Sequence, residues 1–315
     1  MIRNLLRLLL AAYFLCGFAP AAPSARPGIL IMAHGDSPDW NAAVEEAAAP
    51  LGKILPVTIA FGMAQPHSIE MALVRLQSQG VTHVAVVRLF VSDESFRGQI
   101  EYLLGLQPEP PPIFLEHSME PGLTPAEAVK LLPPDAAPPA VRHNATLALN
   151  RQGLYDSART SRILVDRVKA LSVSPSNESV LIIAHGEGNQ ALNQKWISRV
   201  EALASRVRDF APFQQVRVET LQEDWPEERR EAERRIRNFV QQADEEGGDM
   251  LVVPFRVFGF GPYAEVLEGL EYKSDGKGLL PHHEVTEWIK DQAEDCFKQM
   301  DIPPVFTSGK GADGE

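Results

Sequence analysis

The 315-residue chain is 44% hydrophobic and 23% charged, which is typical of a soluble globular protein with room for one large domain or two ordinary ones. Its formal net charge of -12 speaks against nucleic acid or an anionic membrane as a partner, whereas a cationic ligand is compatible with it. The chain has only two cysteines, Cys16 and Cys296, so a zinc site built on several cysteines is excluded.

The first 21 residues have the three-part pattern of a secretory signal peptide. Arg3 and Arg7 precede an apolar run at 8–18, and the small residues at 19–21 fit a cleavage site. The run is about 11 residues long, which is shorter than the roughly 20 needed to span a bilayer. An uncleaved anchor is the alternative. We expect signal peptide 1–21 to be removed, leaving a periplasmic or secreted protein without membrane contact and with Cys296 as its single thiol.

Strands and helices alternate through the first part of the mature chain. Residues 28–33 are a short, continuous apolar run bounded by turn residues, which is typical of a buried strand in a parallel sheet. Asp39 and Ser68 are the expected N-caps of the two helices that follow. The alternation predicts βαβ units and a first lobe over 28–115. Its further elements are a helix at 39–54, a strand at 57–61, a helix at 68–79, a strand at 83–91 and a helix at 94–104.

Ten prolines crowd residues 106–142, so a long helix is excluded there. This stretch has room for an edge strand at 113–115, which we expect to be the last strand of the first lobe, and for a short helix at 126–132. Residues 116–142 are therefore predicted to be a Pro-rich linker.

The alternation restarts in a second lobe, predicted over 143–303. The tail at 304–315 is poor in apolar residues and is expected to be disordered. The predicted elements of the second lobe are strands at 145–149, 179–184, 215–221 and 249–257, and helices at 157–171, 191–210, 227–244, from 263, and at 286–300.

Two segments of the lobes resemble each other. The apolar run and Ala-His-Gly at 28–35 are matched at 179–186, and the strand at 86–91 is matched at 252–257. Two matches in the same order predict an α/β fold of two similar parallel-sheet lobes. In parallel sheets, ligands bind outside the carboxyl ends of the strands, so we expect a central cleft there between the lobes.

His34 and His185 directly follow the matched strands, at the end where ligands bind. A neutral imidazole there is a metal ligand or a general base. The alternative is a histidine that only hydrogen-bonds a loop carbonyl, which the repetition disfavours. Asp36 and Glu187 stand two residues beyond each histidine, either as metal or orienting groups or as charges that suit a helix N-terminus.

Arg88 and Arg256 lie in apolar strands, so each requires an anionic partner. That partner is either a substrate carboxylate, which would make the arginines ligand-binding residues, or an internal Asp or Glu. The loop at 258–263 is rich in glycine and aromatic residues, but it lacks the spacing of a dinucleotide or phosphate loop. Its rings either pack on a flat ligand or belong to the core.

The segments 29–37, 66–73 and 80–87 resemble the class II metal chelatases, which are the sirohydrochlorin cobalto- and ferrochelatases. Ala184-His185-Gly186 resembles the paired half of their long, two-lobed form. The resemblance implies a chelatase-like fold around a cleft. It also implies that a divalent metal, cobalt or iron, is inserted as a substrate into a tetrapyrrole without ATP. His34 would bind the metal and take protons, and His185 would share the metal role by the repeat.

The chain departs from that family at one position. Active members carry a second histidine shortly after the strand that corresponds to 83–91, and residues 91–96 have none. Asp93 as a metal ligand and Glu94 as a catalytic group would supply oxygen donors instead. The first functional hypothesis is therefore a monomeric chelatase. The alternative is an exported, non-catalytic protein that binds metal or tetrapyrrole. A hydrolase is a weak third hypothesis, because no Gly-x-Ser-x-Gly motif is present.

Overall fold

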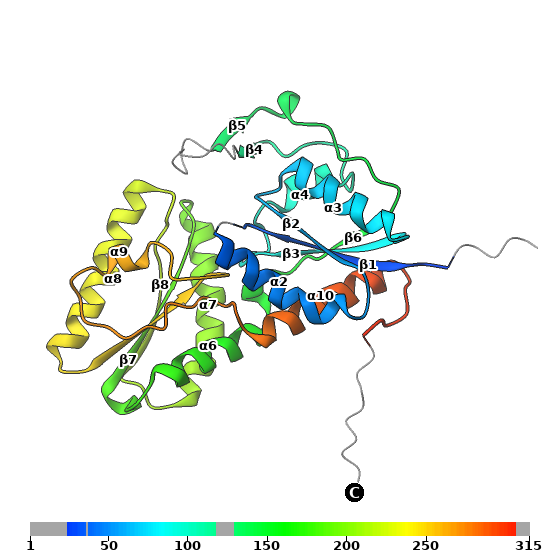
Figure 1. Cartoon of the computed structure of the whole chain (residues 1–315). Helices are drawn as coiled ribbons and strands as arrows, with labels where there is room; N and C mark the ends of the chain where they lie inside the picture. The colour runs from blue at the N-terminus through cyan, green and yellow to red at the C-terminus, as the bar shows by residue number, and fades with distance from the viewer. Residues whose placement is uncertain (1–23, 36, 118–128, 307–315) are drawn as a thin grey trace, which may run out of the picture.

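The computed structural model describes residues 24–35, 37–117 and 129–306. The predicted signal peptide, Asp36, residues 118–128 of the predicted linker and the tail from residue 307 lie outside them. The described residues form two parallel sheets that stand side by side, with helices on both faces of each (Figure 1). None of the helices within these ranges is both long and apolar enough to cross a membrane.

The first sheet has four parallel strands in the order β2-β1-β3-β6. The central strand β1 pairs with β2 on one side and with β3 on the other. The apolar residues of β1 alternate between two layers of helices. Leu30 and Met32 face α3 and α4, and Ile29 and Ile31 face α2. The elements of this lobe are β1 (Pro27–Ala33), α2 (Pro38–Gly52), β2 (Val57–Phe61), α3 (Pro66–Ser78), β3 (His83–Leu89), α4 (Arg97–Leu103) and β6 (Thr146–Leu149).

The second sheet has three parallel strands in the order β8-β7-β9, which is the same arrangement as the β2-β1-β3 part of the first. Leu181 and Ile183 face α8, and Val180 and Ile182 face α6 and α7. The elements of the second half of the chain are α6 (Ala158–Leu171), β7 (Glu178–Ala184), α7 (Gln190–Phe210), β8 (Gln215–Thr220), α8 (Pro226–Glu245), β9 (Asp249–Phe255), α9 (Tyr263–Val266) and α10 (His283–Gln299). Three short 3-10 helices also occur, η1 (Pro134–Ala136), η2 (Leu154–Asp156) and η3 (Pro175–Asn177).

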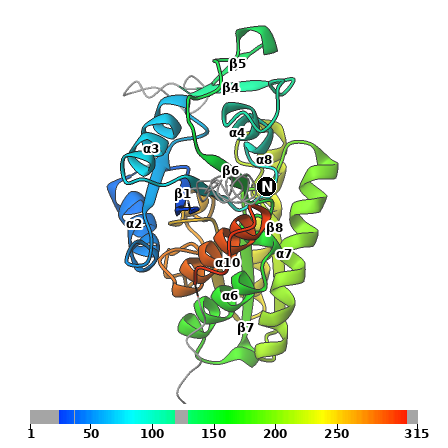
Figure 2. The same ribbon diagram turned by 90° about the vertical axis from the view of Figure 1, so that its right-hand side faces the viewer.

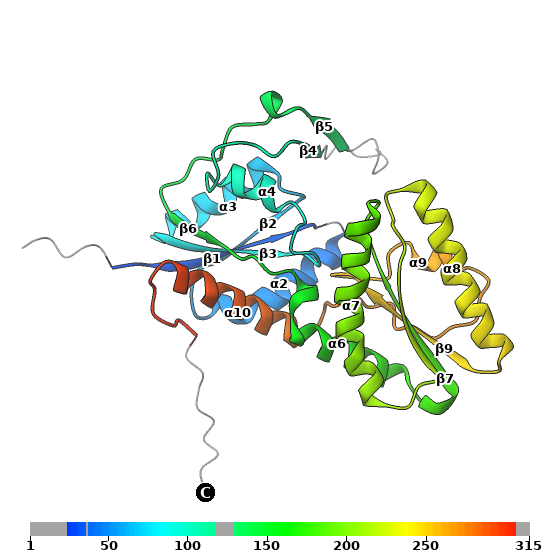
Figure 3. The same cartoon turned by 180° about the vertical axis from the view of Figure 1, so that it is seen from behind.

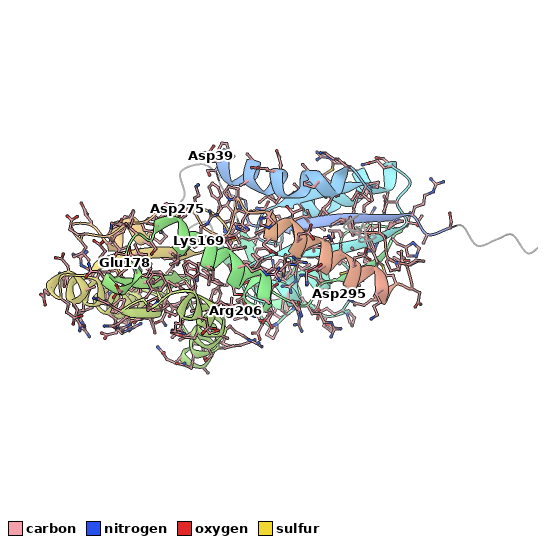
Figure 4. The ribbon with its side chains drawn as sticks, turned by 90° about the horizontal axis from the view of Figure 1, so that it is seen from below. Asp39, Lys169, Glu178, Arg206, Asp275 and Asp295 are labelled. Atoms are coloured by element: carbon pink, nitrogen blue, oxygen red, sulfur yellow. The ribbon has the colours of Figure 1, made fainter. Side chains whose placement is uncertain are left out.

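One helix from the second half of the chain, α10, packs on the first lobe. After β6 the chain leaves the first sheet, and α6 packs on β9 and α7 of the second lobe. After the second sheet, α10 returns to pack on α2 and β3 of the first lobe, and Figure 4 shows α2 and α10 side by side beneath that sheet. One apolar cluster therefore runs through both lobes, from Ile31 to Ile182. Cys296 on α10 is buried in this cluster as a free thiol, and burial raises its pKa to about 12.

The structure corrects several predictions for the Pro-rich region. The strand expected at 113–115 is β4 (Phe114–His117). It pairs only with β5 (Val129–Leu132), in a separate antiparallel hairpin that stands above the larger sheets (Figure 2). Residues 129–132 were expected to be helical, but they are the partner strand that β4 requires. The strand expected at 145–149 to begin the second lobe is β6, which pairs with β3 and is the fourth strand of the first sheet.

Both predicted N-caps are also wrong. Ser37, not Asp39, caps α2, because its hydroxyl accepts the amide hydrogen of Trp40 at 3.3 Å. The cap of α3 is Gln65 rather than Ser68. In both helices a proline occupies the first turn, where its missing N–H costs nothing, and the cap is the residue just before it.

Candidate functional site

His34 and His185 leave the carboxyl ends of the two central strands, and these ends point toward the space between the sheets (Figure 1). The glycine after each histidine has a left-handed backbone, with φ of 68° at Gly35 and 83° at Gly186. A Cβ on Gly186 would lie 2.6 Å from the Cβ of Thr220, so a side chain does not fit there. The repeated His-Gly pair is thus a tight turn that presents an imidazole at the end of each sheet.

Among the described residues, only Nδ1 of the His34 imidazole has a hydrogen-bond partner. Its Nδ1 lies 2.5 Å from the carbonyl oxygen of Gly35, and a carbonyl only accepts, so Nδ1 carries the proton. When the ring is neutral, Nε2 therefore holds the lone pair, and none of the described residues forms a hydrogen bond to it. The ring of His34 stacks on Trp40, with 5.3 Å between the ring centroids. Trp40 in turn packs against Phe258 of the second lobe, with 6.2 Å between the centroids. The half-buried His34 therefore offers a metal ligand or base at the lobe junction.

His185 has a different environment, because both of its nitrogens face acceptors. Nδ1 lies 2.9 Å from the carbonyl of Gly186, and Nε2 lies 3.3 Å from the carboxylate of Asp224. Burial alone would lower the pKa of His185, but the hydrogen bond with Asp224 and the nearby Glu223 outweigh it and raise the pKa to about 8. At neutral pH the ring is thus mostly an imidazolium, which has no lone pair for a metal.

Tryptophans and carboxylates surround His185. Trp196 and Trp225 lie 6.2 and 6.1 Å from its ring, the first tilted and the second edge-on. The carboxyl of Glu187 has a raised pKa, mainly because it is buried, and Asp224 and Glu94 add to the effect. Glu94 belongs to the first lobe, and its ion pair with Lys195 near the start of α7 joins the two lobes. The counterpart of Glu187, Asp36, lies outside the described residues.

Asp93 and Glu94 lie in the loop after β3 and are bound by a lysine from the other lobe. Lys195 on α7 places its Nζ 3.2 Å from Oδ1 of Asp93 and 2.6 Å from Oε1 of Glu94. The hydroxyl of Tyr155 also donates a short hydrogen bond to Asp93. Burial disfavours the Asp93 carboxylate, but the bonds from Tyr155 and Lys195 outweigh this and lower its pKa. Burial and the same hydrogen bond raise the pKa of Tyr155 to about 12.

The two arginines both have internal partners. Arg88 is 1% exposed and donates to the backbone carbonyls of Asp93, Ser95 and Asn150, so carbonyls rather than a carboxylate surround it. Burial lowers the pKa of Arg88 to about 10. Arg256 binds both carboxylate oxygens of Glu223 at 2.7 Å. Arg88 thus shapes the loop that carries Asp93, whereas Arg256 pairs with a carboxylate next to the partner of His185.

The predicted residues therefore fall into three groups. Arg88 of β3 binds the backbone of the first-lobe loop that carries Asp93 and Glu94. His185 and Arg256 are linked through the adjacent residues Glu223 and Asp224. His34 is joined to the second lobe by Trp40 and Phe258. Within residues 24–35, 37–117 and 129–306, no three His, Cys, Asp or Glu side chains converge as a ready-made metal site. The described residues therefore offer a metal at His34 no complete set of protein ligands.

The structure has two further cavities, which do not include the two strand-end histidines. One of about 480 Å³ opens between α7, β8 and α8, and another of about 590 Å³ lies between α6, α7 and the start of α10. Neither is lined by His34 or His185.

Sequence reasoning missed Lys195, Tyr155 and Asp224. One signal for Asp224 is available in the sequence, because it follows β8, the neighbour of β7, at the edge of the sheet where ligands gather. No such signal exists for Lys195, since a lysine in the first turns of a polar helix resembles any solvated lysine.

Comparisons with known proteins agree with this architecture. Residues 28–105 match the model of the CbiX family. SirB from Bacillus subtilis with Fe3+ aligns with a TM-score of 0.58 at 16% identity, over 89% of this chain and 99% of that one. The sirohydrochlorin chelatase SirB from Bacillus subtilis subspecies spizizenii in complex with cobalt aligns with a TM-score of 0.53 at 14% identity, over 86% and 96% of the two chains. No curated protein sequence matches the chain.

These findings confirm the predicted resemblance to the class II chelatases and the predicted chelatase-like α/β fold. The family match covers most of the first lobe, which contains His34, Arg88, Asp93 and Glu94. At such low identities, the likeness to SirB shows the fold alone.

Proposed function

We propose that this chain, whose first lobe matches the CbiX family, is a chelatase-like protein that inserts a divalent metal into a tetrapyrrole such as sirohydrochlorin. Cobalt and iron are the candidate metals, because the two SirB structures that share the fold hold Fe3+ and cobalt. The observation that carries the proposal is the Nε2 lone pair of His34, which is presented at the end of a central strand within the matched segment.

The proposed reaction exchanges protons for a metal. A tetrapyrrole with two pyrrole N–H groups and a divalent ion give the metallated macrocycle and two protons, so no oxidant or ATP is required. The metal is a substrate here. His34 serves through Nε2, either by holding the incoming ion or by accepting a pyrrole proton, because one lone pair does not do both at once.

Glu94 is the best candidate for the second group. Glu94 lies in the loop that follows β3, and His34 directly follows β1. The two strands are neighbours and end level with each other, because Ala33 pairs with Leu89. The Glu94 side chain is 55% exposed and only its Oε1 is held by Lys195, whereas Asp93 is 20% exposed and is bound by both Tyr155 and Lys195. We therefore assign the role of oxygen donor or proton acceptor to Glu94. Asp93 binds the same lysine, Lys195, beside it.

Metal insertion into sirohydrochlorin by the mature chain tests this function. Formation of the metallated product from Co²⁺ or Fe²⁺ would be followed by its absorbance, with His34→Ala and His185→Ala as a matched pair. We expect His34→Ala to lower the rate by about 100-fold or more, as for the loss of a positioned base, and His185→Ala to lower it far less. Equal rates for wild type and His34→Ala would contradict the proposal.

The alternative function is an exported protein that binds metal or tetrapyrrole without turnover. It is favoured by the Lys195 ammonium, which already occupies both carboxylates at the position where active relatives carry a histidine. Saturable binding of Co²⁺ or sirohydrochlorin with no metallated product would support this alternative. Export itself is tested by the mass of the mature chain recovered from the periplasm, which should lack residues 1–21.

A further inference from the structure

Lys195 crosses from the second lobe to the candidate site of the first. It lies in the first turns of α7, whose N-terminal half runs beside the first lobe (Figure 3). One helical turn later, Arg199 on the same face of α7 contacts Asp156 at 3.5 Å. The face of α7 that carries Lys195 and Arg199 is thus the polar contact of the second lobe with η2 and the loop after β3.

The two lobes hold different parts of that loop. Its backbone is held from within the first lobe, because Arg88 donates to the carbonyls of Asp93 and Ser95, and Ser92 accepts the amide hydrogen of Glu94 at 3.1 Å. Among the described residues, the side chain of Glu94 pairs with Lys195 of the second lobe, whose Nζ lies 2.6 Å from Oε1. The first lobe therefore fixes the backbone of Glu94, and Lys195 of the second lobe fixes the direction of its carboxylate.

The exposure of the Lys195–Glu94 ion pair indicates that the pair orients a side chain and adds little to the stability of the fold. The side chains of Lys195 and Glu94 are 32% and 55% exposed, and ion pairs this open to water add little to stability. A glutamate has three rotatable side-chain bonds, so an unpaired Glu94 would sample many directions. Fixing Oε1 leaves the other oxygen presented in one direction, which is the way that partners outside the coordination sphere orient metal ligands.

We propose that Lys195 is a positioning residue that orients the Glu94 carboxylate, so that metal handling in the first lobe depends on contact with the second. The inference rests on the proposed function of His34 and Glu94. It gives the second lobe a role in the reaction that its own histidine, held by Asp224, does not fill. It also explains how a carboxylate with a flexible side chain can stand where relatives carry a histidine.

The test measures Co²⁺ binding to the mature chain without macrocycle, by calorimetry and by the visible absorption of the bound ion. Lys195→Ala should weaken Co²⁺ binding by about 10-fold, as expected when a partner of a metal ligand is lost, and Lys195→Arg should recover most of the affinity. In a Glu94→Gln background, Lys195→Ala should have almost no further effect, because the group that it orients is gone. Lys169→Ala, an exposed lysine on α6 that Figure 4 labels, is the matched control and should bind like wild type.

The outcomes separate this inference from the proposed function. If His34→Ala abolishes Co²⁺ binding while Lys195→Ala binds like wild type, the role of Lys195 is refuted and the function of His34 stands. If His34→Ala neither weakens Co²⁺ binding nor slows insertion, the proposed function fails, whatever Lys195 does. Equal losses in Lys195→Ala with and without Glu94 would also overturn the inference, because Lys195 would then act through another group.

Discussion

The two lobes present the same His-Gly turn at the same strand end, and they use it differently. In the first lobe, Nδ1 of His34 meets a backbone carbonyl and Nε2 stays without a hydrogen bond to any described residue. In the second lobe, His185 meets a carbonyl on one side and Asp224 on the other. Among the described residues, one carboxylate, that of Asp224, therefore distinguishes the surroundings of the two rings, and it comes from a neighbouring strand end, outside the repeated segment.

The largest expected effect concerns the apolar core that the lobes share. Trp288 on α10 is 1% exposed within the cluster that runs through both lobes, whereas Phe239 on α8 belongs to a cluster of the second lobe only. Trp288→Ala should cost about 3–5 kcal/mol, from lost burial and the cavity left behind. Hydrogen exchange should then accelerate in both sheets.

Phe239→Ala is the control for the shared core, and it should accelerate exchange in the second sheet more than in the first. If Trp288→Ala left the exchange of the first sheet unchanged, the lobes would be independent units, and the packing of α10 would matter little.

The two His-Gly turns should differ in their tolerance of a side chain. Both glycines have positive φ, but a Cβ would come within 2.6 Å of Thr220 at Gly186 and only within 3.0 Å of Phe61 at Gly35. Gly186→Ala should therefore cost about 2–4 kcal/mol, and Gly35→Ala about 1–2 kcal/mol, in the free energy of unfolding from denaturant titration. Gly52→Ala, where no atom lies within 4 Å, should be close to neutral. Equal losses at Gly186 and Gly52 would refute this account of the turn.

The smallest effect is the pH dependence that His185 adds. Its pKa is raised in the folded chain from 6.5 to about 8, so the folded state holds this proton more tightly than the unfolded state does. The stabilisation is complete below pH 6.5 and is lost as the pH rises through about 8. After allowance for a side chain that is 35% exposed, it amounts to about 1 kcal/mol.

Asp224→Asn is the matched variant for this pH effect. It keeps the shape of the side chain but removes its charge, so the fall in stability between pH 6.5 and 8 should flatten. An unchanged slope in Asp224→Asn would show that another group is responsible.

The sequence predicts the parts of the fold that are coded locally. The runs at 28–33 and 179–184 are short, apolar and bounded by turn residues, which favours buried strands and places the histidines that follow them at the carboxyl edge. The pairing of β6 with the first sheet and the return of α10 to the first lobe were not predictable, because an apolar face does not say which sheet will cover it. The hairpin strand at 129–132 was missed because four residues fit a helix turn as well as a strand.

For the candidate site, too, the sequence predicts the local features but not the contacts between distant residues. The sequence identifies His34, Asp93 and Glu94 as polar groups at strand ends, but the contacts that decide their chemistry come from distant residues. Asp224 reaches His185 from another strand, and Lys195 reaches Glu94 from another lobe. Such pairs bring together residues about 40 to 100 positions apart, and neither periodicity nor local motifs encode them.

The central claim is that His34 and His185 are chemically unequal, and a titration of both rings with paramagnetic Co²⁺, followed by NMR at pH 7, tests it most directly. The His34 ring signals should broaden at substoichiometric Co²⁺, while those of His185 persist and report an imidazolium. Broadening of His185 first, or of both rings together, would contradict the claim.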